Sequence, residues 1–202
     1  MMFKILIASS NKGKVLEIQN FLSQYLEIEC LSLKDIDYND EMPIESGKTY
    51  QENAKIKALF FAKLCDLPVL ADDSGLECKA LGGRPGLLSA RLGENDKHRR
   101  EELLKLLGYA AGEFPYSACF KSSLCFVIDS KTYFYDGEIQ GFIQSHEVGN
   151  FGFGYDPLFY LEDGRSFAQI DTSEKNQISH RANALLKFKE DLIQKNLAIK
   201  IE

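Results

Sequence analysis

Residues 68–75 read PVLADDSG, a short apolar run that leads directly into two neighbouring carboxylates, Asp72 and Asp73. The run has the length and composition of a buried strand, so we expect a strand that ends at the two carboxylates. In α/β sheets, ligands bind in the crevice at the carboxyl ends of parallel strands. The pair therefore indicates either a site for a hard cation such as Mg²⁺ or a local turn capped by an aspartate.

The segments around this strand alternate between strand-like and helical patterns. Residues 3–8 are a short apolar run typical of a buried strand, and from Val15 apolar residues recur at helical spacing. Residues 28–33 predict a second strand, and residues 50–65 predict a helix that leads back to PVLAD. A last helix is expected from about Ser179. Helices that alternate with strands indicate an α/β protein.

The middle of the chain predicts an antiparallel insertion into that sheet. Residues 117–130 alternate strictly, which predicts a half-buried strand. One of its faces carries Ala118, Phe120, Ser122, Leu124, Phe126 and Ile128. The turn DSK at 129–131 then leads into a second strand, so we expect a hairpin and a mixed sheet. Residues 96–108 predict an amphipathic helix that is ended by Gly108.

Composition narrows the class of protein. A chain of 202 residues with 45% apolar and 27% charged residues is typical of one soluble folded unit, and no stretch approaches the length of a membrane span. The five cysteines form no C-x-x-C pair, which argues against disulfides and thiolate zinc sites and favours the cytoplasm. The net charge of −6 disfavours nucleic-acid binding, so an anionic ligand requires local cations or a metal.

Lys57 conflicts with the pattern of the helix that carries it. At about 100° per residue it falls between Phe61 and Leu64, inside the apolar arc. Its ammonium either extends to water along the helix surface or points into a cleft, with Asn53 one turn before it near the same edge. Glu45, in the loop before this helix, is a candidate metal ligand, although nothing local distinguishes it from other glutamates.

Three further segments carry groups able to hold an anionic ligand. Residues 9–14, SSNKGK, join a strand to a helix, which favours an anion or is simply a capped helix start. Residues 149–157, GNFGFGYDP, place aromatic rings on a glycine-rich loop, either to stack on a flat ligand ring or to pack in the core. Residues 174–186 open the last helix with Lys175, His180 and Arg181. The histidines lack metal-ligand spacing, which disfavours zinc.

Taken in order, five segments resemble the inosine triphosphate pyrophosphatase, or Ham1-like, family, which removes non-standard purine nucleoside triphosphates. They are SSNKGK (9–14), ESGKTYQENAKIKA (45–58), ADDSGLECKALGGRPGLLSAR (71–91), FGYDPLF (153–159) and EKNQISHRANAL (174–185). The resemblance runs from residue 7 to about residue 185. Leu92 departs from it, since an aromatic residue is usual at that position.

The resemblance implies a fold and a reaction. The fold is expected to be an elongated mixed α/β sheet with flanking helices, forming two lobes around a central nucleotide-binding cleft. Residues 1–202 would be a single domain, with the hairpin region of about 116–148 mainly in one lobe, and the protein a homodimer. The reaction would be Mg²⁺-dependent hydrolysis of ITP, dITP and XTP to the monophosphate and pyrophosphate, which cleanses the nucleotide pool.

The resemblance also implies site residues. Glu45 and Asp73 would bind the metal, and Asp73, supported by Asp72, would accept the proton of the attacking water. By the same resemblance, the residues expected to bind substrate are Ser9, Ser10, Asn11, Lys12, Gly13, Lys14, Ser74, Phe153, Gly154, Tyr155, Asp156, Lys175, His180 and Arg181. The pattern of the sequence adds Asn53, Lys57 and Arg91 to them. Two alternatives remain open: a pyrophosphatase for other modified nucleoside triphosphates, and a nucleotide-binding module without turnover.

Overall fold

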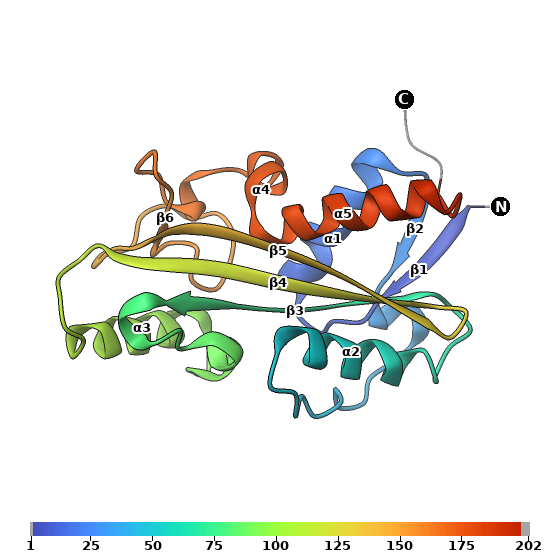
Figure 1. Cartoon of the computed structure of the whole chain (residues 1–202), viewed down its shortest axis with the longest axis horizontal. Helices are drawn as coiled ribbons and strands as arrows, with labels where there is room; N and C mark the ends of the chain where they lie inside the picture. The colour runs from blue at the N-terminus through green and yellow to red at the C-terminus, as the bar shows by residue number, and fades with distance from the viewer. Residues whose placement is uncertain (1, 199–202) are drawn as a thin grey trace. The chain divides into compact units, whose positions relative to one another are not determined.

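The computed structural model describes residues 2–198 (Figure 1). Its strands are β1 (Phe3–Ile7), β2 (Ile28–Leu31), β3 (Val69–Cys78), β4 (Tyr116–Ile128), β5 (Lys131–Ile143) and β6 (Phe159–Tyr160). Its α-helices are α1 (Lys12–Tyr25), α2 (Tyr50–Phe61), α3 (Asp96–Gly108), α4 (Thr172–Ile178) and α5 (His180–Gln194). Short 3-10 segments are η1 (Leu33–Ile36), η2 (Lys79–Leu81), η3 (Gly86–Arg91) and η4 (Phe167–Gln169). None of the helices within residues 2–198 has the length and apolar character needed to cross a membrane.

The strands form one mixed sheet of six, in the order β2-β1-β3-β4-β5-β6. β1 pairs in parallel with β2 and with β3, whereas β5 pairs antiparallel with β6. β4 and β5 are joined by Asp129 and Ser130, whose φ angles are 47° and 61°. A two-residue connection with positive φ at both positions joins antiparallel strands. The predicted α/β class, mixed sheet and hairpin are thereby confirmed.

The chain divides into two compact units. Unit 1 comprises the chain up to Asp73, Ser122–Gly137 and the chain from Arg181, and unit 2 comprises Ser74–Lys121 and Glu138–His180. Residues 116–148, the expected hairpin region, are divided between the two units. β4 and β5 have 13 residues each. Such strands extend for roughly 40 Å, which is longer than the core of one small unit.

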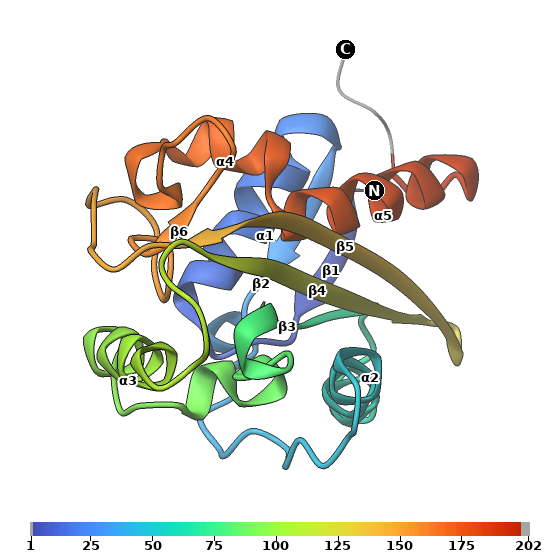
Figure 2. The same ribbon diagram turned by 60° about the vertical axis from the view of Figure 1, so that its left-hand side comes forward.

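In unit 1, helices cover both faces of the strands. Ile5 and Ile7 belong to the core cluster formed with α1 and α5, whereas Leu6 and Ala8 belong to the cluster formed with α2. Neighbouring strand residues project to opposite faces, so a continuous apolar run such as FKILIA is what a strand covered on both faces requires. Figure 2 shows α2 on one side of β1 and β4, with α1 and α5 on the other.

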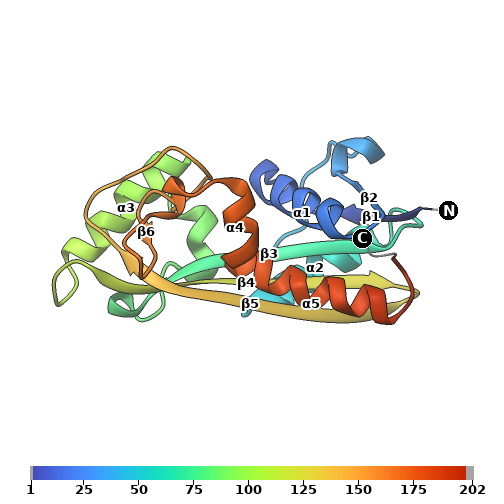
Figure 3. The same cartoon turned by 90° about the horizontal axis from the view of Figure 1, so that it is seen from above.

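β4 differs from the half-buried strand that its alternation predicts. Every residue from Ser122 to Val127 is buried. Phe126 packs against Phe188 of α5, and Val127 belongs to the cluster formed with α2. Figure 3 shows α5 running along this part of β4 and β5. The prediction was wrong because a helix covers each face, and small Ser and Cys side chains fill the space beneath α2.

Unit 2 has a core of its own. Leu103 and Leu107 of α3 belong to it together with Phe120 and Phe167, and α3 occupies the predicted residues 96–108. α5 begins at His180, one residue after the expected start. The segment before it is a separate helix, α4, because Ser179 has extended backbone with ψ 162°. Lys175 therefore lies on α4, and not in the first turn of the last helix as its sequence position predicts.

Candidate active site

Asp72 and Asp73 lie inside β3, and not at its end as the apolar run predicts. The parallel ladder stops at the pair Ile7 and Leu70, because β1 ends there. β3 continues to Cys78, and its later residues are buried in the core of unit 2. The two carboxylates therefore still follow directly on the carboxyl end of parallel pairing, where α/β sheets bind ligands.

The two carboxylates project to opposite faces of β3, as neighbouring strand residues do. Asp72 lies on the face covered by α1 and α5. Its Oδ2 is 2.8 Å from Nζ of Lys14 and 3.3 Å from Nη2 of Arg181. Ser122 donates its hydroxyl to the other oxygen, Oδ1, at 2.5 Å. The side chain of Asp72 has no exposed surface, so these contacts replace all of its hydration.

Arg181 extends this arrangement to Glu17 of α1. Its guanidinium donates to the carboxylates of both Glu17 and Asp72. We call Lys14, Glu17, Asp72 and Arg181 the buried ion network. Burial raises the pKa of Asp72, but the cations Arg181 and Lys14 outweigh it and hold that pKa far below its usual value. The network therefore stays charged and ties α1 and α5 to β3.

Asp73 lies on the face covered by α2. Asn53 donates its side-chain N–H to Oδ2 at 3.2 Å, and Nζ of Lys57 is 3.2 Å from Oδ1. The same ammonium lies 2.5 Å from Oε1 of Glu45. Asn53 also accepts the backbone N–H of Gly47 at 2.8 Å, which ties the loop that carries Glu45 to α2.

Lys57 is buried and paired, so it does not extend to water. Only 7% of its side chain is exposed, and α2 ends at Phe61, before the predicted end at residue 65. Burial lowers the pKa of Lys57, but Asp73 and Glu45 outweigh it and raise that pKa. Burial raises the pKa of Asp73, and Glu45 and Asp72 add to this against the cations Lys57 and Lys14. A further cation beside Asp73 would therefore be stabilised.

Glu45 and Asp73 fit a magnesium ion. Their oxygens already converge on one cation, the Lys57 ammonium, at 2.5 Å and 3.2 Å. Mg²⁺ prefers hard oxygen ligands and is usually held by one or two carboxylates together with substrate phosphates. Within the described part of the chain, no three His, Cys, Asp or Glu side chains form a group able to hold a metal ion.

Residues 9–14 form the capped start of α1, which begins at Lys12 and not at Val15. The side chain of Asn11 accepts the backbone N–H of Lys14 at 3.1 Å, and Ser9 Oγ accepts that of Asn11 at 3.2 Å. Ser10 and Lys12 are exposed, and Gly13 lies in the first turn. Burial lowers the pKa of Lys14, and nearby cations lower it further, although Asp72 opposes them. Added negative charge here would relieve that repulsion.

In unit 2, the structure brings together Phe153, Asp156 and Lys175. Nζ of Lys175 is 2.5 Å from Oδ2 of Asp156, and 4% of each side chain is exposed. The same ammonium lies 4.9 Å from the centroid of the Phe153 ring. Asp156 also accepts the backbone N–H of Phe153 at 2.9 Å, which closes the glycine-rich loop. The loop therefore presents an aromatic ring beside a buried ion pair.

The rest of that loop is fixed by the body of unit 2. Tyr155 is buried and donates its hydroxyl to the backbone oxygen of Ser89 at 2.8 Å, so its ring packs in the core. Gly154 donates its backbone N–H to Asp96 of α3 at 2.8 Å. Tyr155 therefore packs in the core, whereas Phe153 lies beside the ion pair.

The remaining predicted residues of unit 2 lie in three places. His180 is buried and stacks on Phe120, with ring centroids 4.8 Å apart and an interplanar angle of 12°. Ser74 follows Asp73 on β3, and Arg91 is exposed at the end of η3. The boundary between the units falls between His180 and Arg181, so these two neighbours belong to different units.

Comparison with known proteins identifies the family. The sequence model of the Ham1 family matches residues 5–191. This chain belongs to the Ham1 family. A relative from Thermoanaerobacter sp. (strain X514), named dITP/XTP pyrophosphatase, is 41% identical over 196 residues, covering 95% of this chain and 98% of the relative. A relative of the same name from Haemophilus influenzae is 43% identical over 196 residues, covering 94% and 98%.

Solved structures agree with this Ham1 assignment. The HAM1 protein of Coxiella burnetii superposes with a TM-score of 0.84 at 36% identity, covering 96% of this chain and 100% of that chain. The nucleoside-triphosphatase / dITP/XTP pyrophosphatase of Mycobacterium abscessus superposes with a TM-score of 0.70 at 36% identity, covering 92% and 98%. The resemblance inferred from the five segments, and the mixed α/β fold that it implies, are confirmed.

The sequence analysis does not identify two residues, Glu17 and Ser122, that contact predicted site residues in the structure. Glu17 lies on the buried face of α1 beside Ile18 and Phe21, so the helical-arc argument that marks Lys57 also marks Glu17. Ser122 lies among apolar residues on one face of β4. A hydroxyl in such a row is a weak signal, and nothing in the sequence identifies Asp72 as its partner.

Proposed function

We propose that this protein hydrolyses the non-standard purine nucleoside triphosphates dITP, XTP and ITP to the nucleoside monophosphate and pyrophosphate, with Mg²⁺. The enzyme class, a nucleoside triphosphate pyrophosphatase, follows from its place in the Ham1 family. One observation carries the proposal beyond that class: the carboxylates of Glu45 and Asp73 converge on a single cation. A protein that only bound nucleotides would need its lysines but not this pair of carboxylates.

The roles of the unit 1 residues follow from their charges. Residues Ser9–Lys14 and Asn53 bind the triphosphate, and Lys14 and Lys57 neutralise charge on its nonbridging oxygens. Phosphoryl substitution is catalysed chiefly by such positioning and charge neutralisation. Bound between Glu45 and Asp73, Mg²⁺ would polarise the phosphates and acidify a nearby water. Within unit 2, we assign Lys175 to the substrate as a further cation.

Asp73 accepts the proton of the attacking water. Asn53 holds one of its oxygens in place, and its carboxylate lies beside the position proposed for Mg²⁺, where it can accept a proton from a nearby water. Asp72 supports it from the other face of β3 by holding Lys14 and Arg181 in place, and takes no proton, because its own pKa is far below the usual range.

Unit 2 supplies the groups for the purine and the sugar. We assign them to Ser74, Arg91, Phe153, Gly154, Tyr155, Asp156, Lys175 and His180, with Arg181 of unit 1. Hypoxanthine and xanthine carry a carbonyl at the six position, whereas adenine carries an amino group. A donor that faces an amino group is left unpaired, which costs about 1–3 kcal/mol when it is buried. Preference for dITP, XTP and ITP over ATP follows.

The decisive assay is pyrophosphate release from dITP with Mg²⁺, and its loss in EDTA. A substrate panel of dITP, XTP, ITP, ATP and a modified pyrimidine triphosphate separates the proposal from its nearest alternative, a pyrophosphatase for other modified nucleotides. Equal kcat/KM for ITP and ATP would refute the specificity account. Nucleotide binding without any pyrophosphate release would refute hydrolysis itself and leave a binding module.

We also propose that the protein acts as a homodimer in the cytoplasm, and that residues 1–202 form one domain. The dimer and the single domain are supported by Ham1 membership, and the cytoplasm is supported by the reducing environment that the cysteine pattern favours. Sedimentation at micromolar concentration tests the dimer, and a single cooperative unfolding transition tests the single domain. A monomer, or two separate transitions, would contradict them.

A further inference from the structure

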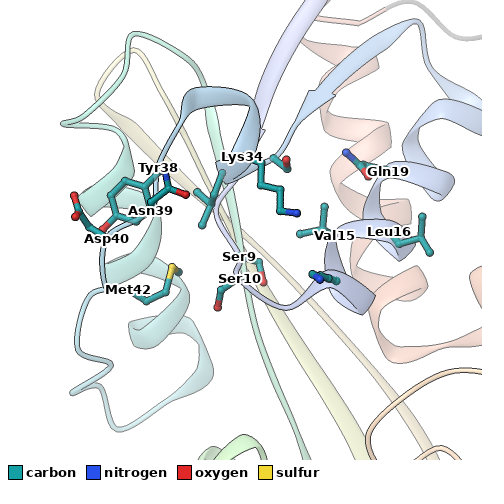
Figure 4. Close-up of a pocket in the computed structure, with 13 residues that line it drawn as sticks. Ser9, Ser10, Val15, Leu16, Gln19, Lys34, Tyr38, Asn39, Asp40 and Met42 are labelled. Atoms are coloured by element: carbon teal, nitrogen blue, oxygen red, sulfur yellow. The ribbon is translucent and has the colours of Figure 1, made fainter.

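A cavity of about 520 Å³ lies between the start of α1 and the segment Ser32–Met42, entirely within unit 1 (Figure 4). Its volume is in the range of small-molecule sites, about 300–1,000 Å³. One side of it consists of groups proposed above for the triphosphate: Ser9, Ser10 and Lys12. The other side consists of η1 and the loop after it, which have no assigned role.

Two exposed lysines line this cavity. Lys12 and Lys34 both line it, and neither forms an ion pair with any residue from 2 to 198. The one carboxylate in the lining, Asp40, lies at the far end of the cavity from Lys34 (Figure 4). Within residues 2–198, the lysines with little exposed side chain, Lys14, Lys57 and Lys175, are each paired with a carboxylate. The charge of Lys34 acts on the neighbouring carboxylate of Asp35, but Asp35 is held by Ser32, so the two ammonium groups of the cavity remain available to an anion.

A buried hydroxyl donor also points to a ligand. Ser9 is only 9% exposed, and its Oγ accepts the backbone N–H of Asn11. Its own O–H donates to no acceptor among the described residues. Buried donors are nearly always satisfied, so an acceptor from outside the chain is expected here. Figure 4 shows Ser9 and Ser10 together, with the Lys34 side chain extending from η1 toward the start of α1.

We propose that this cavity holds inorganic pyrophosphate, the product that leaves the nucleotide, and that Lys34 is one of its ligands. Pyrophosphate is compact, carries several negative charges and offers only acceptors, which matches two ammonium groups and the hydroxyls of Ser9 and Ser10. The inference rests on the proposed function, since pyrophosphate is the released end of the triphosphate. It adds Lys34, outside every segment assigned above, and a place for the product between cleavage and release.

The test is calorimetric titration of the full-length protein with pyrophosphate at constant MgCl₂, without nucleotide. We expect Lys34→Ala to weaken binding about threefold to tenfold, the loss of one charge-assisted hydrogen bond at a partly solvated site. Lys34→Arg should keep most of the affinity. Lys63→Ala is the matched control, because Lys63 is an exposed lysine of unit 1 that lines a different pocket. It should bind pyrophosphate as the wild type does.

Three results would overturn the assignment. They are no measurable pyrophosphate binding by the wild type, equal binding by the wild type and Lys34→Ala, and an equal loss of affinity for dIMP in Lys34→Ala. The last result would make the cavity a nucleotide site. Because calorimetry needs no turnover, a wild type that does not hydrolyse dITP but binds pyrophosphate through Lys34 would refute the proposed function alone.

Discussion

Replacing Asp72 with Asn should destabilise the fold strongly, although it changes only one atom of the side chain. In the buried ion network, the cations Lys14 and Arg181 face the carboxylates of Glu17 and Asp72, so the formal charges sum to zero. The side chains of Asp72 and Arg181 are 0% and 2% exposed. Asp72→Asn leaves one uncompensated positive charge in this interior. Breaking a buried ion pair from one side costs about 3–5 kcal/mol.

Urea unfolding followed by circular dichroism measures this loss. With a slope of about 2–3 kcal/mol per molar urea, the midpoint should fall by about 1–2 M. The double variant Lys14→Met/Asp72→Asn restores a formal sum of zero, so it should be more stable than the two single effects predict, by about 1 kcal/mol or more. Glu29→Gln is the control, because it removes a surface ion pair with 40% of its side chain exposed and should shift the midpoint little.

Asp72→Asn should also change how the free energy of unfolding depends on pH in the acidic range. The pKa of Asp72 is lower in the folded protein than in the unfolded chain, so its stabilisation is complete above about pH 4–5 and is lost as pH falls toward the folded pKa. Asp72→Asn should therefore lose less stability between neutral and acidic pH than the wild type. An Asp72→Asn protein within about 0.5 kcal/mol of the wild type, or strictly additive effects in the double variant, would refute the network argument.

Asp73→Asn should stay folded and lose at least about a hundredfold in kcat/KM for dITP, because the proton acceptor is gone. Near-normal turnover by this variant would show that Asp73 is not the proton acceptor. Lys57→Met leaves the carboxylates of Glu45 and Asp73 without their shared cation. MgCl₂ should therefore raise the melting temperature of this variant more than that of the wild type, and equal shifts in melting temperature would contradict this. Gly149→Ala should cost several kcal/mol more than Gly154→Ala, as measured by urea unfolding. Both glycines have positive φ, but only at Gly149 would a Cβ meet backbone, at 2.1 Å, and equal losses would exclude the clash as cause.

Patterns of local origin in the sequence predict the fold well. The strand at 3–8, the helix at 96–108 and the hairpin around 129–131 are recovered because each depends on periodicity or turn chemistry within a few residues. The burial of β4 is not recovered, since it depends on two helices that are distant in sequence. The separate helix α4 is not recovered, because it lies directly before α5 and only the extended backbone of Ser179 divides the two helices.

The sequence predicts which residues belong to the candidate site, but it does not predict which of them contact one another. The sequence marks Lys57 as a lysine in an apolar arc, but only coordinates show that Glu45 and Asp73 share its ammonium. The sequence marks Arg181 as a substrate-binding residue, but only coordinates show that Glu17 and Asp72 hold its guanidinium. Arg181 is separated from both of these partners by more than 100 residues, and no local pattern carries that information. The alternation of a strand does carry part of it, since it already places Asp72 and Asp73 on opposite faces.

The position of Lys57 affects how the metal binds. Lys57 occupies the space between the same carboxylate oxygens that would hold Mg²⁺, at 2.5 Å from Glu45 and 3.2 Å from Asp73. Two cations can share those carboxylates only if further negative charge arrives, and a triphosphate brings it. Metal and triphosphate should therefore strengthen each other's binding, by equal factors, because coupling between two ligands is reciprocal. In Lys57→Met the ammonium no longer competes, so Mg²⁺ should bind without the nucleotide, which is why that variant separates the role of the lysine from that of the metal.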